Sequence, residues 1–246
     1  MILRRFTKHV TEQNWFAVGL DVIVVVLGIF LGMQLTEWNE DRKVKAEWRS
    51  TLESLQVEFT INLQSIEDNR QSLVARVGAV SQSLKMLLDC EIQPGEMELF
   101  QRGLMETRGT LGLSMRKIVL ESILNESKFQ SFLISNRKQH LQELLTQLGH
   151  NQSEAGFYES LPFDDIPSKH SAVKVVANDG KEYPYSVSLL VLAVPFEEAC
   201  SDQGFVKSLD WWVNAQSAQL WVAKDLLVLF ADARDTVSKW QGNNGK

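Results

Sequence analysis

Apolar residues gather in one long stretch near the N-terminus, residues 16–35, with the sequence FAVGLDVIVVVLGIFLGMQL. About 20 helical residues at ~1.5 Å each cover the ~30 Å hydrocarbon core of a bilayer. Trp15 and Trp38 bracket the stretch, and tryptophan rings favour the headgroup region of a membrane. The pattern therefore predicts a transmembrane helix over residues 16–36, with Trp15 and Trp38 as interfacial anchors.

Two other kinds of segment can carry a long apolar run. A buried core helix normally keeps a polar stripe, which this stretch lacks. A cleaved signal peptide has an apolar core of ~7–15 residues followed by a small-residue cleavage site. Here the apolar core is longer and runs into QLTEW at residues 34–38. We therefore favour an uncleaved membrane anchor.

Beyond the span, the apolar positions follow a heptad pattern. One apolar position recurs every seven residues, at Leu52, Phe59, Ile66, Leu73, Val80 and Leu87. We expect one near-continuous helix of about 70 residues, ended by the turn signal Pro94-Gly95. The periodicity is typical both of a coiled coil with a second copy and of a helix that packs on later helices of the same chain.

Shorter helices are predicted in the middle of the chain. Residues 96–108 form one, and Ser114 is the expected cap of a second that ends at Leu124. Residues 127–148 form a third, and residues 149–168, which contain two prolines, are expected to be loop.

Strand character is confined to residues 172–194, where β-branched runs flank an Asn178-Asp179-Gly180 turn. This predicts a small β-hairpin, with a helix over 186–194 as the alternative. From Gly204 a last long helix is expected to run to Trp240 and to pack on the first one.

The predicted fold is therefore mainly α: a single N-terminal transmembrane helix that continues into a long-helix coiled-coil or bundle domain, with a small β-hairpin at 172–194. The expected regions are a cytoplasmic basic tail (1–15), the transmembrane helix (16–36), a coiled-coil-like helical region (37–148), a loop-rich insert (149–203) and a C-terminal long helix and tail (204–246).

The distribution of charge limits which partners the chain can bind and indicates its orientation in the membrane. The chain has 25 basic and 31 acidic residues, so the region after the span keeps 22 basic and 29 acidic residues once Arg4, Arg5, Lys8, Glu12 and Asp21 are set aside. An acidic domain has no reason to bind nucleic acid. The basic head favours a cytoplasmic N-terminus, which places the large domain in the periplasm.

Three residues of the span share one helix face. Gly28 and Gly32 form a GxxxG pattern, which lets two helices approach closely in lipid. Asp21 lies on the same face, so we expect all three in a helix–helix interface. An acid inside a membrane is costly unless it is protonated, reaches the interface or finds a partner. The sequence leaves three interpretations of Asp21 open: local water solvates it, it pairs with a partner, or it translocates ions.

Catalytic motifs are not evident. Walker, dinucleotide-binding and nucleophile-elbow patterns are missing, and His150 and Glu154 make an i, i+4 pair with no third ligand nearby in sequence. Cys90 and Cys200 are 110 residues apart and are expected to form either a disulfide outside the cytoplasm or two free buried thiols. We therefore expect no enzyme, no cofactor and no metal site.

Residues 19–42, GLDVIVVVLGIFLGMQLTEWNEDR, resemble a family of uncharacterised bacterial inner-membrane proteins. Its members have a short basic tail, an acid-containing apolar span and a Q-x-x-x-W-N-E motif, here Gln34, Trp38, Asn39 and Glu40. The resemblance implies a bacterial origin, an inner-membrane anchor and a helical domain after the span. It brings no activity and no catalytic residues.

The sequence as a whole favours a membrane-anchored interaction or scaffold protein. The expected partners are the lipid bilayer, a second copy bound through the span or the coiled coil, and a membrane protein. The last helix carries several tryptophans, which predict either core packing or an aromatic docking face. The alternative function is a non-catalytic subunit of an ion-driven machine that uses Asp21, by analogy of layout with the small subunits of Ton, Tol and flagellar stators.

Overall fold

The structure is a computed structural model that describes residues 15–163, 166–178 and 188–243, without the side chains of residues 15–19, Asp21 and Asn243. The chain divides into two compact units, residues 1–50 and 51–246. Helices dominate both, as the sequence predicts, and the described residues contain one two-stranded sheet. The finer division of the extramembrane region into three parts stays a prediction.

The first described helix, α2, covers Trp15–Asp89 and has 75 residues. This confirms the prediction of a near-continuous helix. It ends where Cys90 adopts a φ of +50°, and the following turn contains Gly95 at a φ of +94°. Positive φ favours glycine, so Pro94-Gly95 is a turn that the sequence correctly identifies.

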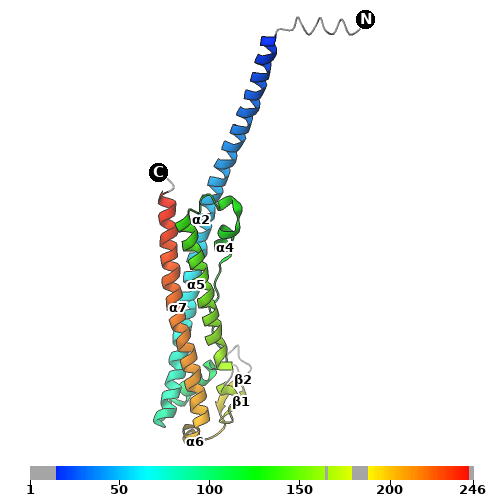
Figure 1. Cartoon of the computed structure of the whole chain (residues 1–246). Helices are drawn as coiled ribbons and strands as arrows, with labels where there is room; N and C mark the ends of the chain where they lie inside the picture. Colours follow the sequence, from blue (N-terminus) through cyan, green and yellow to red (C-terminus); the bar gives the residue numbers. More distant parts are fainter. Residues whose placement is uncertain (1–14, 164–165, 179–187, 244–246) are drawn as a thin grey trace, which may run out of the picture. The chain divides into compact units, whose positions relative to one another are not determined.

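Three long helices form the body of the 51–246 unit: the later part of α2, α5 (Ser135–Ser160) and α7 (Gln203–Asn243) (Figure 1). Phe59 of α2 packs on Phe230 of α7 with ring centroids 5.8 Å apart, while Cys90 lies beside Cys200, just before α7 begins. Residue numbers thus rise along α2 as they fall along α7, so the two helices are antiparallel.

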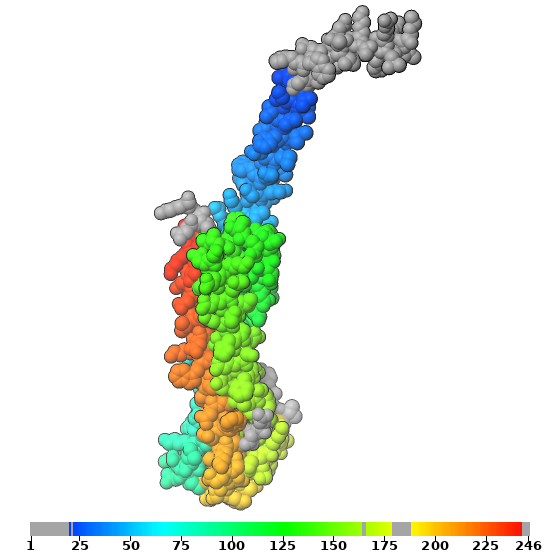
Figure 2. Space-filling view, viewed as in Figure 1, coloured from blue at the N-terminus to red at the C-terminus, as the bar shows by residue number. Residues whose placement is uncertain are grey.

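Helix α7 is antiparallel to α5 as well. Near the C-terminal end of α7, Trp240 packs edge-on against His140, and further back the side-chain amide of Gln219 donates to the Ala155 carbonyl at 3.1 Å. Figure 2 shows the two helices side by side along one face of the unit. A three-helix bundle results, in which α2 and α5 run parallel and α7 runs opposite to both, so the chain returns along the bundle between Asp89 and Ser135.

The heptad stripe of α2 lies in the core of this bundle. Each of its six members is at most 1% exposed within a single chain: Leu52, Phe59, Ile66, Leu73, Val80 and Leu87. The opposite stripe on α7 is equally buried, including Phe205, Leu209, Leu226 and Phe230. The heptads therefore pack within the chain, which decides between the two interpretations that periodicity leaves open.

Short elements connect the long helices: α3 (Met97–Glu106), α4 (Ile118–Asn125), η1 (Ser127–Phe129), η2 (Leu161–Phe163), η3 (Pro167–Lys169) and α6 (Phe196–Ser201). The predicted cap of α4 is wrong, since the residue before this helix is Lys117 and not Ser114. The predicted helix 127–148 is divided into η1 and α5.

The predicted loop from Gly149 is also wrong up to Ser160, because α5 continues through Gly149 and Gly156. Two glycines cost a helix about 1 kcal/mol each relative to alanine. Tertiary packing offsets this cost, since Leu148 and Ala155 face α7 seven residues apart and are each 1% exposed.

The sheet pairs β1 (Val173–Ala177) with β2 (Ser188–Leu192) in antiparallel fashion. The predicted β-hairpin is confirmed, and the alternative helix over 186–194 is wrong for the strand residues. The register pairs Ala177 with Ser188, so residues 178–187 join the strands. Of the predicted turn Asn178-Asp179-Gly180, Asp179 and Gly180 lie outside the described residues.

Candidate functional site

The apolar stretch at the start of α2 is the first functional feature. From Leu20 to Trp38, every large apolar side chain that the structure describes is between 52% and 65% exposed. A core helix of a soluble protein would be mostly buried, whereas no part of this apolar window is buried. Among the described residues, one helix is long and apolar enough to cross a membrane, and the side chains of its apolar stretch are exposed to solvent.

The predicted interface residues lie on this helix. A Cβ atom added to Gly28 or Gly32 would meet nothing within 4 Å, so the open glycine face is free for another helix. Trp38 is 59% exposed and holds the Arg42 guanidinium 5.0 Å from its ring centroid. Asp21 and Trp15 are helical in their backbone, but their side chains lie outside the description.

Inside the 51–246 unit, a ladder of polar side chains on α2 binds the extended segment 107–117. At one end, the Glu58 carboxylate is 6% exposed and accepts hydrogen bonds from the backbone N–H groups of Val119 at 2.9 Å and Leu120 at 3.3 Å. These are donors of the first turn of α4, which have no partner within their own helix. Glu58 therefore caps α4 from another helix.

The other polar side chains of this ladder recur every seven residues along α2. The Asn62 amide donates to the Arg116 carbonyl at 2.7 Å and accepts from the Arg116 N–H at 2.8 Å, and Asn69 donates to the Gly112 carbonyl at 3.4 Å. Arg76 donates to the Glu106 carboxylate at 2.8 Å. Arg76 also donates to the carbonyls of Glu106 at 2.8 Å and Gly109 at 3.0 Å.

Ser83 completes the ladder by donating to the Phe100 carbonyl of α3 at 3.1 Å. Here α3 approaches α2 so closely that a Cβ atom on Gly103 would lie 2.6 Å from the Ala79 carbonyl oxygen. The four positions Asn62, Asn69, Arg76 and Ser83 share one heptad position. Sequence reasoning missed them, although a polar heptad beside the apolar one was the signal that could have found them.

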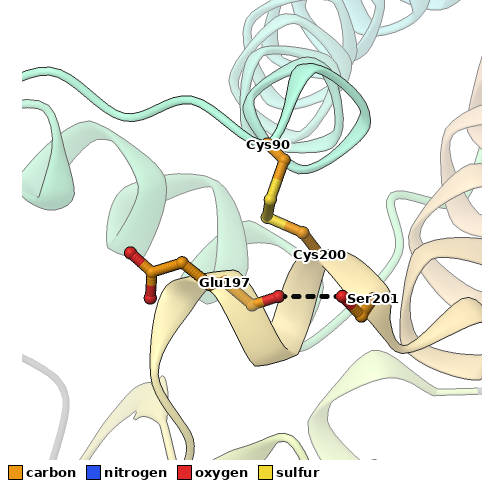
Figure 3. Close-up of a disulfide and its surroundings, with 4 residues drawn as sticks. All are labelled: Cys90, Glu197, Cys200 and Ser201. Carbon is orange, nitrogen blue, oxygen red and sulfur yellow. Dashed lines mark hydrogen bonds between the residues drawn. A yellow bond between two sulfur atoms is a disulfide. The ribbon is translucent and has the colours of Figure 1, made fainter.

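A disulfide joins the end of α2 to α6 (Figure 3). The Cα atoms of Cys90 and Cys200 are 5.5 Å apart, within the usual range for a bridge. Cys200 is 9% exposed while Cys90 lies at the surface. The bridge closes a loop of 110 residues and ties the chain together where α7 is about to begin.

Contacts of Asp202 and His170 also hold the start of α7 in place. Asp202 accepts from the backbone N–H groups of Gly204 at 3.0 Å and Phe205 at 3.1 Å, and its Oδ1 lies 3.6 Å from His170 Nε2. The His170 ring packs on Phe205, and its Nδ1 accepts from the Ala172 N–H at 3.2 Å. Both ring nitrogens are thus engaged, which makes the pair a structural latch and not a base facing a nucleophile.

Two grooves flank α7. The groove between α2 and α7 has a volume of about 660 Å³ and is walled by Val74, Trp221 and Val228, with Glu67, Arg70 and Lys224 among its lining residues. The groove between α5 and α7, about 620 Å³, is polar and includes Glu154, Asp225 and Asp232. Among the tryptophans of α7, Trp212 is 1% exposed and belongs to the core, whereas Trp221 is 68% exposed.

The charges in the apolar groove are arranged by one bidentate ion pair. Arg70 donates through two nitrogens to the two oxygens of Glu67, each at 2.8 Å. Hydrogen bonds from Arg70 and Gln71 lower the pKa of Glu67 from 4.5 to about 2, and the same pair raises the pKa of Arg70. Lys224 lies 5.5 Å from the Trp221 ring centroid.

His150 Nε2 lies 3.8 Å from the carboxylate of Glu154, one turn further along α5. Within the described ranges, no three His, Cys, Asp or Glu side chains are grouped so that they could hold a metal ion.

Comparison with known proteins gives no match to a family model, to a curated protein or to a solved structure. The resemblance in residues 19–42 therefore stays a prediction, and the function must be argued from the molecule itself.

Proposed function

We propose that this protein is a membrane-anchored helical interaction protein that self-associates. In this proposal, residues 16–36 hold it in the bacterial inner membrane, its N-terminus lies in the cytoplasm, and its helical domain lies in the periplasm. The observation that carries the proposal is the exposure of every described apolar side chain from Leu20 to Trp38. Such a surface is stable in lipid and is an aggregation hazard in water.

The disulfide supports the periplasmic location of the domain. Disulfides persist in oxidising compartments such as the bacterial periplasm and are rare in the cytoplasm. Cys90 and Cys200 both belong to the helical domain and form one bridge. The basic head before the span favours the same orientation.

The surface of the domain supports an interaction role. Trp221 and Val228 stand exposed beside an apolar groove, at 68% and 57%. The polar groups with the most elaborate hydrogen bonding, those of the α2 ladder and of the His170 latch, are used to hold segments of the chain in place. Binding through the exposed apolar side chains is the role that these features favour.

Alkaline extraction and protease protection test the anchor and its orientation. The full-length protein is expected to remain in the membrane pellet at alkaline pH. Protease added to spheroplasts is expected to degrade the domain while a cytoplasmic marker stays intact. Release into the supernatant would overturn the anchor, and protection of the domain would overturn the orientation.

Two differently tagged copies, expressed together, test self-association. We expect one tag to co-purify with the other from cross-linked membranes, and we expect Gly28→Leu combined with Gly32→Leu to reduce recovery.

Asp21→Asn separates the proposal from the ion-driven alternative. An interaction protein should keep its location and partners in this variant, whereas a stator-like activity would be lost.

A further inference from the structure

The α2/α7 groove is an open, mainly apolar surface of the described chain. Its floor contains the half-buried Leu220 and Leu227, and its walls are Val74, Trp221 and Val228. Three charged residues, Glu67, Arg70 and Lys224, belong to the same lining. An apolar groove between two helices is a typical docking place for a third helix.

The antiparallel pairing of α2 and α7 fixes which groups lie level with one another. Phe59 faces Phe230 and Cys90 is joined to Cys200, so residues between them pair in reverse order. On this scale Arg70 lies level with residues 219–220 and Glu67 with residues 222–223, so Trp221 and Lys224 are displaced from them by only one or two residues along α7. The presence of all four residues in one groove agrees with this alignment.

We propose that this groove receives α7 of a second copy of the chain, an inference that rests on the proposed self-association and names its surface. In a parallel pair of bundles, a two-fold axis along the bundle keeps each residue level with its counterpart. Trp221 of the second copy then meets Arg70, and its Lys224 meets Glu67.

These contacts are complementary in chemistry. A guanidinium packs well on the face of a tryptophan ring, and the Arg70–Glu67 ion pair holds the guanidinium in place. Lys224 of the second copy brings a cation to the Glu67 carboxylate, whose two oxygens already accept hydrogen bonds from Arg70. The symmetry forms each contact twice, and it covers the exposed Trp221 and Val228 of both copies.

The groove on the other side of α7 does not offer such a fit. Its carboxylates, Glu154, Asp225 and Asp232, would face an α7 that itself carries Asp225 and Asp232. Like charges brought together at an interface are repulsive. The cluster of carboxylates therefore disfavours a second α7 in the α5/α7 groove. Anchoring in one membrane raises the effective concentration of copies, so even a modest interface can be occupied.

Site-specific photo-crosslinking in membranes tests this inference. Benzoylphenylalanine replaces Trp221 in the full-length protein, and two isotopically distinct copies are mixed so that cross-links between chains can be recognised by mass. We expect cross-linked dimers in which residue 221 of one copy is attached to residues 67–74 of the other. The same photo-reactive residue in place of Val57, which is 58% exposed on another face of α2, is expected to give no such product.

A matched pair of substitutions provides a second measurement. Val228→Asp and Val57→Asp each place a carboxylate at a valine of nearly equal exposure, 57% and 58%. Val228→Asp should reduce the dimer yield about tenfold, since a buried charge without a partner disfavours association. Val57→Asp should leave the yield unchanged and shows that an added charge on an exposed helix face is tolerated.

The other outcomes separate the two proposals. If tagged copies still co-purify but residue 221 does not cross-link to α2, or Val228→Asp has no effect, the groove is not the interface and self-association stands. If no co-purification occurs, self-association and the groove inference both fail. If residue 221 cross-links to a different protein, the second copy is not the occupant and this inference is overturned.

Discussion

The side-chain amide of Asn62 forms two hydrogen bonds with the backbone of one residue, Arg116, at 2.7 Å and 2.8 Å. Asn62 is 1% exposed, and Arg116 lies in the extended segment that connects α3 to α4. Because this segment has no helix or sheet partner of its own, its backbone groups depend on side chains of α2. The pair therefore joins a long helix to an otherwise irregular stretch of chain.

Asn62→Ala should destabilise the protein by about 1–3 kcal/mol, since it removes two hydrogen bonds to the part-buried backbone of Arg116. Asn69→Ala is the matched control, because Asn69 makes a single long bond of 3.4 Å to Gly112 and is only half-buried. Its expected loss is below about 1 kcal/mol. Urea unfolding of the full chain in detergent, followed by near-UV circular dichroism, measures both, and equal losses would contradict the prediction.

Helix α2 carries one feature that the sequence predicts, its apolar heptad, and one that it does not, the polar ladder. The apolar heptad from Leu52 to Leu87 predicts the long helix and its buried face, because burial of that stripe is the largest energetic requirement of the helix. The span and the hairpin were likewise visible as local patterns. Asn62 and Arg76 were not identified, because their partners lie in a segment with no periodic signal of its own.

The errors have a physical cause as well. A loop was predicted at Gly149 because glycine is a poor helix former, but the contacts of Leu148 and Ala155 with α7 outweigh that local preference. The apolar groove beside Trp221 needs both α2 and α7 in position, and no spacing within one helix reveals it. The aromatic pattern on the last helix predicts a core role or a docking role; Trp212 is buried in the core, and the docking role stays a prediction for the exposed Trp221.

Acid should weaken the Glu67–Arg70 pair only at very low pH. The pKa of Glu67 is lowered to about 2, first by its hydrogen bond with Arg70, and a lowered carboxyl pKa contributes stability that is present above the ordinary value of 4.5. This contribution is lost as the pH falls toward 2. Both side chains are about one third exposed, so solvent screens the pair and the effect on stability is small.

Arg70→Gln is expected to raise the pKa of Glu67 toward its ordinary value, because the largest cause of the shift is removed. A carboxyl-carbon NMR titration of the protein with labelled glutamate measures this directly. Lys224→Gln serves as the control, since Lys224 is not among the causes of the shift. A Glu67 pKa that stays near 2 without Arg70 would contradict the assignment of the cause.

Reduction of the Cys90–Cys200 disulfide should lower stability without changing the fold class. A closed loop of 110 residues restricts the unfolded chain, and the chain-entropy model assigns such a loop about 4–5 kcal/mol. The double substitution Cys90→Ser and Cys200→Ser should therefore unfold at lower urea concentration, and reductant should have no further effect on it. Equal midpoints for the oxidised protein and the double variant would show that the bridge contributes no stability.

The same substitution should have opposite effects at two glycines. Gly103→Ala places a Cβ atom 2.6 Å from the Ala79 carbonyl, so α3 must move away from α2 and the Ser83 bond to Phe100 is strained. A loss of about 1–3 kcal/mol follows from such overpacking. Gly149→Ala meets nothing within 4 Å in the interior of α5 and should stabilise the protein by about 0.5–1 kcal/mol, because alanine favours the helix and restricts the unfolded chain. Thermal unfolding of both variants in detergent tests the pair together. Two changes of the same sign would mean that the close approach of α3 to α2, or the helical continuation of α5, is not maintained in solution.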